Sequence, residues 1–197
     1  MGSTPAIPTK HKEEDFQPVC AYNISIMTLL GHVAASYLLA RSTQLFGYPI
    51  SVPEIETCIV AGTVLDLDIL AGLYLGKSGD KHHNLAIHTP AAVLAIVVTL
   101  ALITKIHLAL VILVALALLL HLALDDISYW FYKLKLQENS SHPQINWLYP
   151  FKKGSPESSW ITGYGNVLKV YFTKAKANVL LEEILLLAAA AVFLISY

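Results

Sequence analysis

Residues 106–132 have the sequence IHLALVILVALALLLHLALDDISYWFY, an apolar run longer than the roughly 17–25 residues that a transmembrane helix needs. Four further apolar runs lie at Asn23–Leu39, Ile55–Leu75, Ala86–Thr104 and Val179–Ile195. The chain is 55% hydrophobic and 14% charged, whereas about 25% of the residues of a soluble domain are charged. The sequence therefore predicts an all-α, polytopic membrane helix bundle with about five transmembrane helices and one domain.

The polar segments predict a tail and one large loop. Residues 1–22 contain Glu13, Glu14 and Asp15 and do not resemble a cleavable signal peptide, so we expect a disordered cytoplasmic tail. Residues 23–197 form the predicted membrane-embedded domain. Its loop 133–177 combines Trp and Tyr with Lys, which is typical of a segment at the lipid headgroups. The simpler alternative is that these aromatic residues only anchor the protein.

Lysine and arginine residues set the expected orientation. A cytoplasmic N-terminus places 11 of the 13 Lys and Arg residues inside and leaves Arg41 and Lys105 outside. This distribution follows the positive-inside rule, so we expect the N-terminus in the cytoplasm and the C-terminus outside. The formal net charge of −1 argues against a nucleic-acid partner. No motif indicates an oligomeric partner.

Histidine and aspartate residues interrupt the apolar runs. An ionised carboxylate at the centre of a membrane helix costs roughly 2.5–3.5 kcal/mol on insertion scales, so several such groups are expected to be functional and paired. Helices that alternate in direction, with a rise of about 1.5 Å per residue, bring these residues to one depth in the cytoplasmic leaflet. The candidate metal ligands are His32, Asp66, Asp68, His83, His88, His121 and Asp125.

The spacing of these residues suits metal ligation. His121 and Asp125 are four residues apart and share one helical face. Asp66 and Asp68 would face apart on a regular helix. They either bind one ion through a distorted backbone, which the flanking Gly62 and Gly72 would permit, or they serve different ions. Imidazole and carboxylate groups without thiolate suit Zn²⁺, Mn²⁺ or Fe²⁺. Seven ligands exceed one tetrahedral site, so we expect two or more divalent ions, with zinc as the first choice.

Less specific interpretations stay open for the individual residues. A single histidine within the membrane is also typical of a hydrogen bond between two helices. Asp126 suits a position behind the ligands or in solvent, and Asp126 or Glu182 is the candidate accessory base. Glu182 and Glu183 are interpreted as solvated carboxylates at a helix start, where the helix dipole favours them.

The order of the motifs resembles a known family. The quoted motifs are Met27–His32, Leu65–Asp68, His83–His88, His121–Asp125 and Trp147–Phe151. Together they resemble the bacterial and archaeal YdjM-like family of inner-membrane metal-dependent hydrolases. Their order is also similar to that of the zinc-dependent phospholipase C and single-strand nuclease superfamily. The resemblance implies the same seven metal ligands; this chain departs from the family pattern at Leu65, where Pro is usual, and at Asn84, where Arg is usual.

Residues and resemblance together predict a membrane-embedded metal-dependent hydrolase of the bacterial or archaeal cell membrane. We expect it to cleave a phosphoester of a lipid-like substrate at the cytoplasmic leaflet, with water activated by metal. Asp66, His88 and Asp126 are the expected catalytic residues, and membrane lipid is the expected substrate or environment. A metal-ion or proton transporter is one alternative. A structural membrane protein, in which the polar cluster only joins the helices, is the other.

Overall fold

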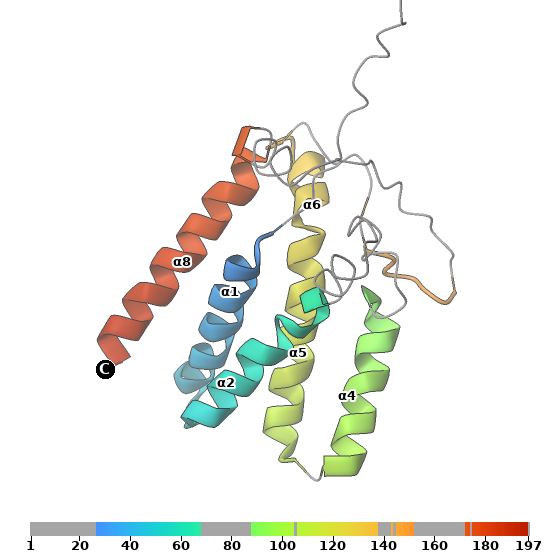
Figure 1. Cartoon of the computed structure of the whole chain (residues 1–197), viewed down its shortest axis with the longest axis vertical. Helices are drawn as coiled ribbons and strands as arrows, with labels where there is room; N and C mark the ends of the chain where they lie inside the picture. Colours follow the sequence, from blue (N-terminus) through green and yellow to red (C-terminus); the bar gives the residue numbers. More distant parts are fainter. Residues whose placement is uncertain are drawn as a thin grey trace, which may run out of the picture.

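The computed structural model describes residues 27–67, 88–104, 106–137, 143, 145–151, 172–173 and 175–196 (Figure 1). The regular secondary structure in these ranges is helical, as the sequence predicts. The helices are α1 (Leu29–Ser42), α2 (Val52–Ala61), α4 (Pro90–Thr104), α5 (Leu108–Asp125), α6 (Ile127–Lys133) and α8 (Lys176–Ser196). Two short 3-10 helices, η1 (Thr43–Phe46) and η2 (Val64–Asp66), follow α1 and α2.

The helices alternate in direction along the chain. In Figure 1, α1, α4 and α8 descend, whereas α2 and α5 rise. Helix α1 packs against α2, α5 and α8, and α5 also packs against α2 and α4. The N-terminal ends of α1, α4 and α8 therefore lie at the same end of the bundle as the C-terminal ends of α2 and α5. The sequence predicts histidine and aspartate residues at one depth, and that prediction requires helices arranged in this way.

Local sequence explains where several helices begin and end. Helix α2 starts after Ser51, whose backbone N–H donates to the Glu54 carboxylate at 2.8 Å as half of a capping box. Helix α4 begins at Pro90. Proline suits the first position of a helix because a backbone N–H there would have no acceptor within the helix. Helix α2 ends at Gly62, and η2 then carries the chain to Asp66. The backbone thus departs from a regular helix at Gly62, and Asp68 and Gly72 lie outside the described residues.

Small side chains let four helices approach closely. The main core joins α1, α2, α4 and α5, and its buried residues include Ala40, Cys58, Val93 and Ala117. Alanine and cysteine at helix contacts allow backbones to come near one another, which is typical of helix packing in membranes. Ile145, far along the chain, is also buried in this core at 2% exposure. The core therefore fixes the helices that carry the site and attaches the segment around residue 145 to them.

Large apolar side chains cover the outer faces of the bundle. Leu102 is 79% exposed, Leu187 is 72% exposed and Ile195 is 86% exposed. Among the described residues, α5 and α8 are long and apolar enough to cross a bilayer, and α4 is apolar but shorter, with 15 residues. Helices α1 and α2 have 14 and 10 residues. Parts of the first and second predicted spans lie outside the described residues, so the five-span arrangement stays a prediction.

Two apolar runs differ in detail from their predicted form. The run 106–132 is divided at Asp126, where α5 ends and α6 begins. Helix α8 starts at Lys176, before the predicted start at Val179. The earlier start brings Asn178 into the helix, where its side-chain amide donates to the hydroxyl of Ser128 on α6. A polar contact between helices thus extends α8 beyond its apolar sequence.

Candidate metal centre

Four ionisable side chains from three parts of the chain converge inside the bundle. His32 lies on the first turns of α1, Asp66 closes η2, and His121 and Asp125 lie one turn apart on α5. Their exposed side-chain fractions are 1% for His32, 13% for Asp66, 0% for His121 and 3% for Asp125. One donor atom from each residue lies within 4.8 Å of the others. These residues make up the candidate metal centre.

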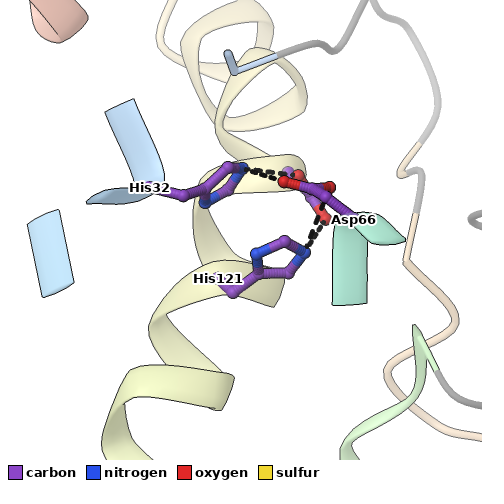
Figure 2. Close-up of side chains that lie close together, drawn as sticks. His32, Asp66 and His121 are labelled. Carbon is purple, nitrogen blue, oxygen red and sulfur yellow. Dashed lines mark ion pairs between the residues drawn. The ribbon is translucent and has the colours of Figure 1, made fainter. Parts of the chain in front are cut away.

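The imidazole nitrogens lie beside both carboxylates. Figure 2 shows the rings of His32 and His121 near the Asp66 side chain. The Nε2 atom of His32 is 3.2 Å from Asp125 Oδ1 and 4.0 Å from Asp66 Oδ2. The Nε2 atom of His121 is 3.1 Å from Asp125 Oδ2 and 3.7 Å from Asp66 Oδ1. The two rings are stacked, with centroids 4.1 Å apart, so the donor atoms face one small volume.

The Asp125 carboxylate lies close to both rings. The Nε2 atoms of His32 and His121 are 3.2 and 3.1 Å from its two oxygens, so each ring can pair with this carboxylate when the ring is protonated. When the rings are neutral, imidazole nitrogens and carboxylate oxygens gathered in this way could instead share a cation.

One hydrogen bond fixes the chemical form of His121. Its Nδ1 lies 2.9 Å from the carbonyl oxygen of Gly62. Because a carbonyl can only accept, Nδ1 carries the proton, and in the neutral ring Nε2 then has a free lone pair. A histidine that binds a metal through one ring nitrogen typically donates a hydrogen bond from its other ring nitrogen, as His121 does here. The break in α2 therefore has two effects: it places Asp66 and it exposes a carbonyl that orients His121.

The distances and the charges both fit a divalent ion. Metal–ligand bonds of 2.0–2.1 Å in a tetrahedral zinc site place neighbouring donor atoms roughly 3.3–3.4 Å apart. The nitrogen–oxygen separations run from 3.1 to 4.0 Å when both oxygens of each carboxylate are counted, and the two longest involve Asp66. With one donor atom from each residue, all four atoms lie within 4.8 Å of one another, so the ligands would move closer together around an ion. Two neutral imidazoles and two carboxylates carry a charge of −2, which one divalent cation balances. The residues of the centre could therefore hold one such ion.

His88, another predicted ligand, lies next to this group without belonging to it. Its side chain is completely buried just before α4, and its ring centroid is 6.0 Å from that of His121. His88 is thus a neighbour of the centre and is not one of the four residues that could hold an ion. The remaining predicted ligands, Asp68 and His83, lie outside the described residues.

Asp126, expected as an accessory catalytic residue, contacts the segment 145–151. It is 1% exposed, and its Oδ2 accepts a hydrogen bond of 2.8 Å from Trp147 Nε1. Asp126 also separates α5 from α6, directly after the candidate ligand Asp125. Its carboxylate therefore links the residue after a ligand to the aromatic segment predicted to lie at the headgroup level.

Glu182 was wrongly interpreted from the sequence as a solvated carboxylate. It is 6% exposed, and it accepts hydrogen bonds from the backbone N–H and the hydroxyl of Thr28 at the start of α1. A sequence signal for this burial exists, since Asn178 and Glu182 are four residues apart and so share one face of an otherwise apolar helix. A polar pair of this kind on a membrane helix predicts a contact with another helix.

Comparison with known proteins leaves the family open. Neither a family model, nor a curated protein, nor a solved structure matches the chain. The resemblance to the YdjM-like family therefore stays a prediction from the order of the motifs. Function must be inferred from the residues of the candidate metal centre themselves.

Proposed function

We propose that the protein is a membrane-embedded, metal-dependent hydrolase that cleaves a phosphoester of a lipid-like substrate. The observation that carries the proposal is the convergence of buried His32, His121 and Asp125 with partly buried Asp66 in a bundle with apolar outer faces. Ionisable groups in such surroundings are costly and are expected to be functional. Imidazole and carboxylate ligands together suit Zn²⁺, Mn²⁺ or Fe²⁺.

Different residues of the centre hold the ion and face the approaching substrate. Gly62 and His121 form the rigid side of the centre through the hydrogen bond to Nδ1. Asp66, at 13% exposure, is the least buried of the four ligands, so the substrate is expected to approach from its side. A divalent ion held there would supply Lewis-acid chemistry and would lower the pKa of a bound water to about 7.

The position of the centre within the bundle supports a lipid-like substrate. It lies near the end of the bundle where α5 gives way to α6, beside an aromatic and Lys-containing stretch. Trp130 is 51% exposed, and the Lys133 ammonium lies 5.3 Å from the centroid of the Tyr129 ring. Aromatic residues and lysines at one level are typical of the membrane interface, where phosphate headgroups lie. The orientation inferred from the lysines makes this the cytoplasmic leaflet.

Hydrolysis by the purified, zinc- or manganese-loaded protein tests the proposal. Mixed micelles with phosphatidic acid, phosphatidylglycerol or phosphatidylcholine are assayed for released headgroup or phosphate by mass spectrometry. Turnover that requires the metal and is lost in Asp66→Asn, but not in the exposed-site variant Glu56→Gln, is expected. Absence of turnover on all phosphoesters with a fully loaded centre would refute the hydrolase proposal.

Transport of metal ions is the second candidate, and the break in α2 favours it. Helices interrupted beside polar groups are typical of the ion sites of transporters. Here α2 ends at Gly62 and the chain continues through η2 to Asp66. Zinc uptake into liposomes that contain the protein, measured with an enclosed fluorescent indicator, separates the two functions. Uptake without hydrolysis would support the transporter, whereas hydrolysis without uptake supports the first proposal.

A further inference from the structure

Glu182 joins α8 to the start of α1. Its side chain is 6% exposed, although most of the apolar part of α8 is not buried. The backbone N–H of Thr28 donates to Glu182 Oε2 at 3.5 Å, and the Thr28 hydroxyl donates to Oε1. Thr28 is the N-cap residue of α1. A carboxylate at this place is favoured by the helix dipole and by N–H groups that lack partners within the helix.

The turn of α1 that Glu182 binds also carries His32. The backbone N–H of His32 donates to the carbonyl of Thr28 at 3.3 Å, so a shift of Thr28 moves the backbone of His32. Gly31 lets Glu182 come close to α1, because a Cβ atom at this position would lie only 3.3 Å from Glu182 Cγ. The side chain of Glu182 is therefore packed on the residue that directly precedes His32.

Other residues of α8 pack behind the candidate metal centre. Leu181 and Leu185 contact a small apolar cluster that contains Ala35 and Leu124, and Leu124 precedes the ligand Asp125. The other polar contact of α8, from Asn178 to Ser128, reaches α6. Among the polar contacts described for α8, the one made by Glu182 leads to α1 and to a ligand.

We infer that Glu182 is a positioning residue of the metal centre. By binding the N-terminus of α1, it sets where His32 Nε2 lies relative to Asp125 Oδ1, 3.2 Å away. Its effect on metal affinity rests on the proposed function. Its effect on the position of the His32 ring does not, because the contacts with Thr28 are made by the chain alone.

Two neighbouring glutamates allow a matched test. Glu182→Gln and Glu183→Gln make the same change in charge at adjacent positions, but Glu183 is exposed. Full-length protein in detergent micelles is titrated with Co²⁺, whose visible absorption reports the ligand geometry. Glu182→Gln is expected to weaken Co²⁺ binding at least about tenfold, as is common for partners behind metal ligands, and to change the absorption band. Glu183→Gln is expected to behave like the wild type.

A measurement without metal isolates the effect on His32. In protein with isotope-labelled histidine, Glu182→Gln is expected to shift the imidazole NMR signals of His32, and Thr28→Val is expected to reproduce the shift. Asn178→Ala removes the contact of α8 with α6 and should leave these signals in place. Equal effects of Glu182→Gln and Glu183→Gln would overturn the inference, and so would equal effects of Glu182→Gln and Asn178→Ala. If the wild type binds no Co²⁺, the proposed function fails and the NMR result alone decides the role of Glu182.

Discussion

A methyl group added at Gly62 is expected to push α1 away from α2 and to disturb the metal centre. The Cβ atom of Gly62→Ala would lie 1.8 Å from Ser36 Oγ and 2.9 Å from Ser36 Cβ. Rotation of the hydroxyl relieves the first contact, but the second requires a shift of the backbone. Overpacking of this kind typically costs about 1–3 kcal/mol. Alanine fits the backbone at φ −73°, which offsets about 0.4–1 kcal/mol, so the free energy of unfolding should fall by up to about 2.6 kcal/mol.

The same substitution should weaken metal binding, because the Gly62 carbonyl accepts a hydrogen bond of 2.9 Å from His121 Nδ1. Alanine keeps this carbonyl but displaces it, so the fall in metal affinity should be no more than the roughly 10- to 100-fold that complete loss of such a partner causes. The assays are zinc titration by calorimetry and unfolding in micelles followed by circular dichroism. Ser36→Gly removes both contacting atoms, so the double variant Ser36→Gly/Gly62→Ala should regain most of the lost affinity. The single variant Ser36→Gly supplies the baseline for the roughly 0.5–1 kcal/mol that glycine costs within a helix.

A Gly62→Ala protein with unchanged stability and zinc affinity would refute the close approach of Gly62 to Ser36. A loss of affinity that Ser36→Gly does not restore would refute the contact as its cause. Either result would also weaken the role of the break in α2 in orienting His121.

Three further outcomes are expected. His121→Ala should abolish the stabilisation by zinc, so that a chelator lowers the thermal unfolding midpoint of the wild type but not of the variant. Trp147→Phe removes the donor to the buried Asp126 carboxylate and should lower the free energy of unfolding by about 1–3 kcal/mol in a denaturant titration; an unchanged value would contradict the role of that bond. The backbone N–H of Ser51 lowers the pKa of Glu54 below its ordinary value of 4.5, so this contact stabilises the fold above that pH and is lost as the pH falls through the lowered pKa. The difference in unfolding midpoint between wild type and Glu54→Gln should therefore shrink as the carboxyl group becomes protonated, and a difference that does not change with falling pH would contradict this source of stability.

The convergence of four of the seven candidate ligands could be predicted, because it follows from the spacing of residues on α5 and from the alternating direction of the helices. His121 and Asp125 share a face through their spacing of four residues, and alternating helices bring Asp66 and His32 to the same end of the bundle. Helix starts at Ser51-Val52 and Pro90 could also be predicted, because a capping box and a proline act within a few residues of the chain.

The partners behind the ligands could not be predicted, since they depend on how helices pack. The carbonyl of Gly62 meets His121 only because α2 ends at that residue and crosses α5. Glu182 was placed in solvent because a carboxylate at a helix start is usually solvated, whereas the N-terminus of α1 binds and buries it. Asp126, at the break between α5 and α6, likewise accepts a hydrogen bond from Trp147, which is 21 residues away in the sequence.

The metal content of the purified protein tests the central claim most directly. Detergent-purified wild type, His121→Ala and the control His107→Ala, which replaces an exposed histidine at the start of α5, are analysed by elemental mass spectrometry. We predict at least about one zinc, manganese or iron ion per chain in the wild type and in His107→Ala, and loss of that ion in His121→Ala. A wild-type protein that holds no such ion after reconstitution, or a His121→Ala variant that holds as much as the control, would contradict the claim that these residues form a metal centre.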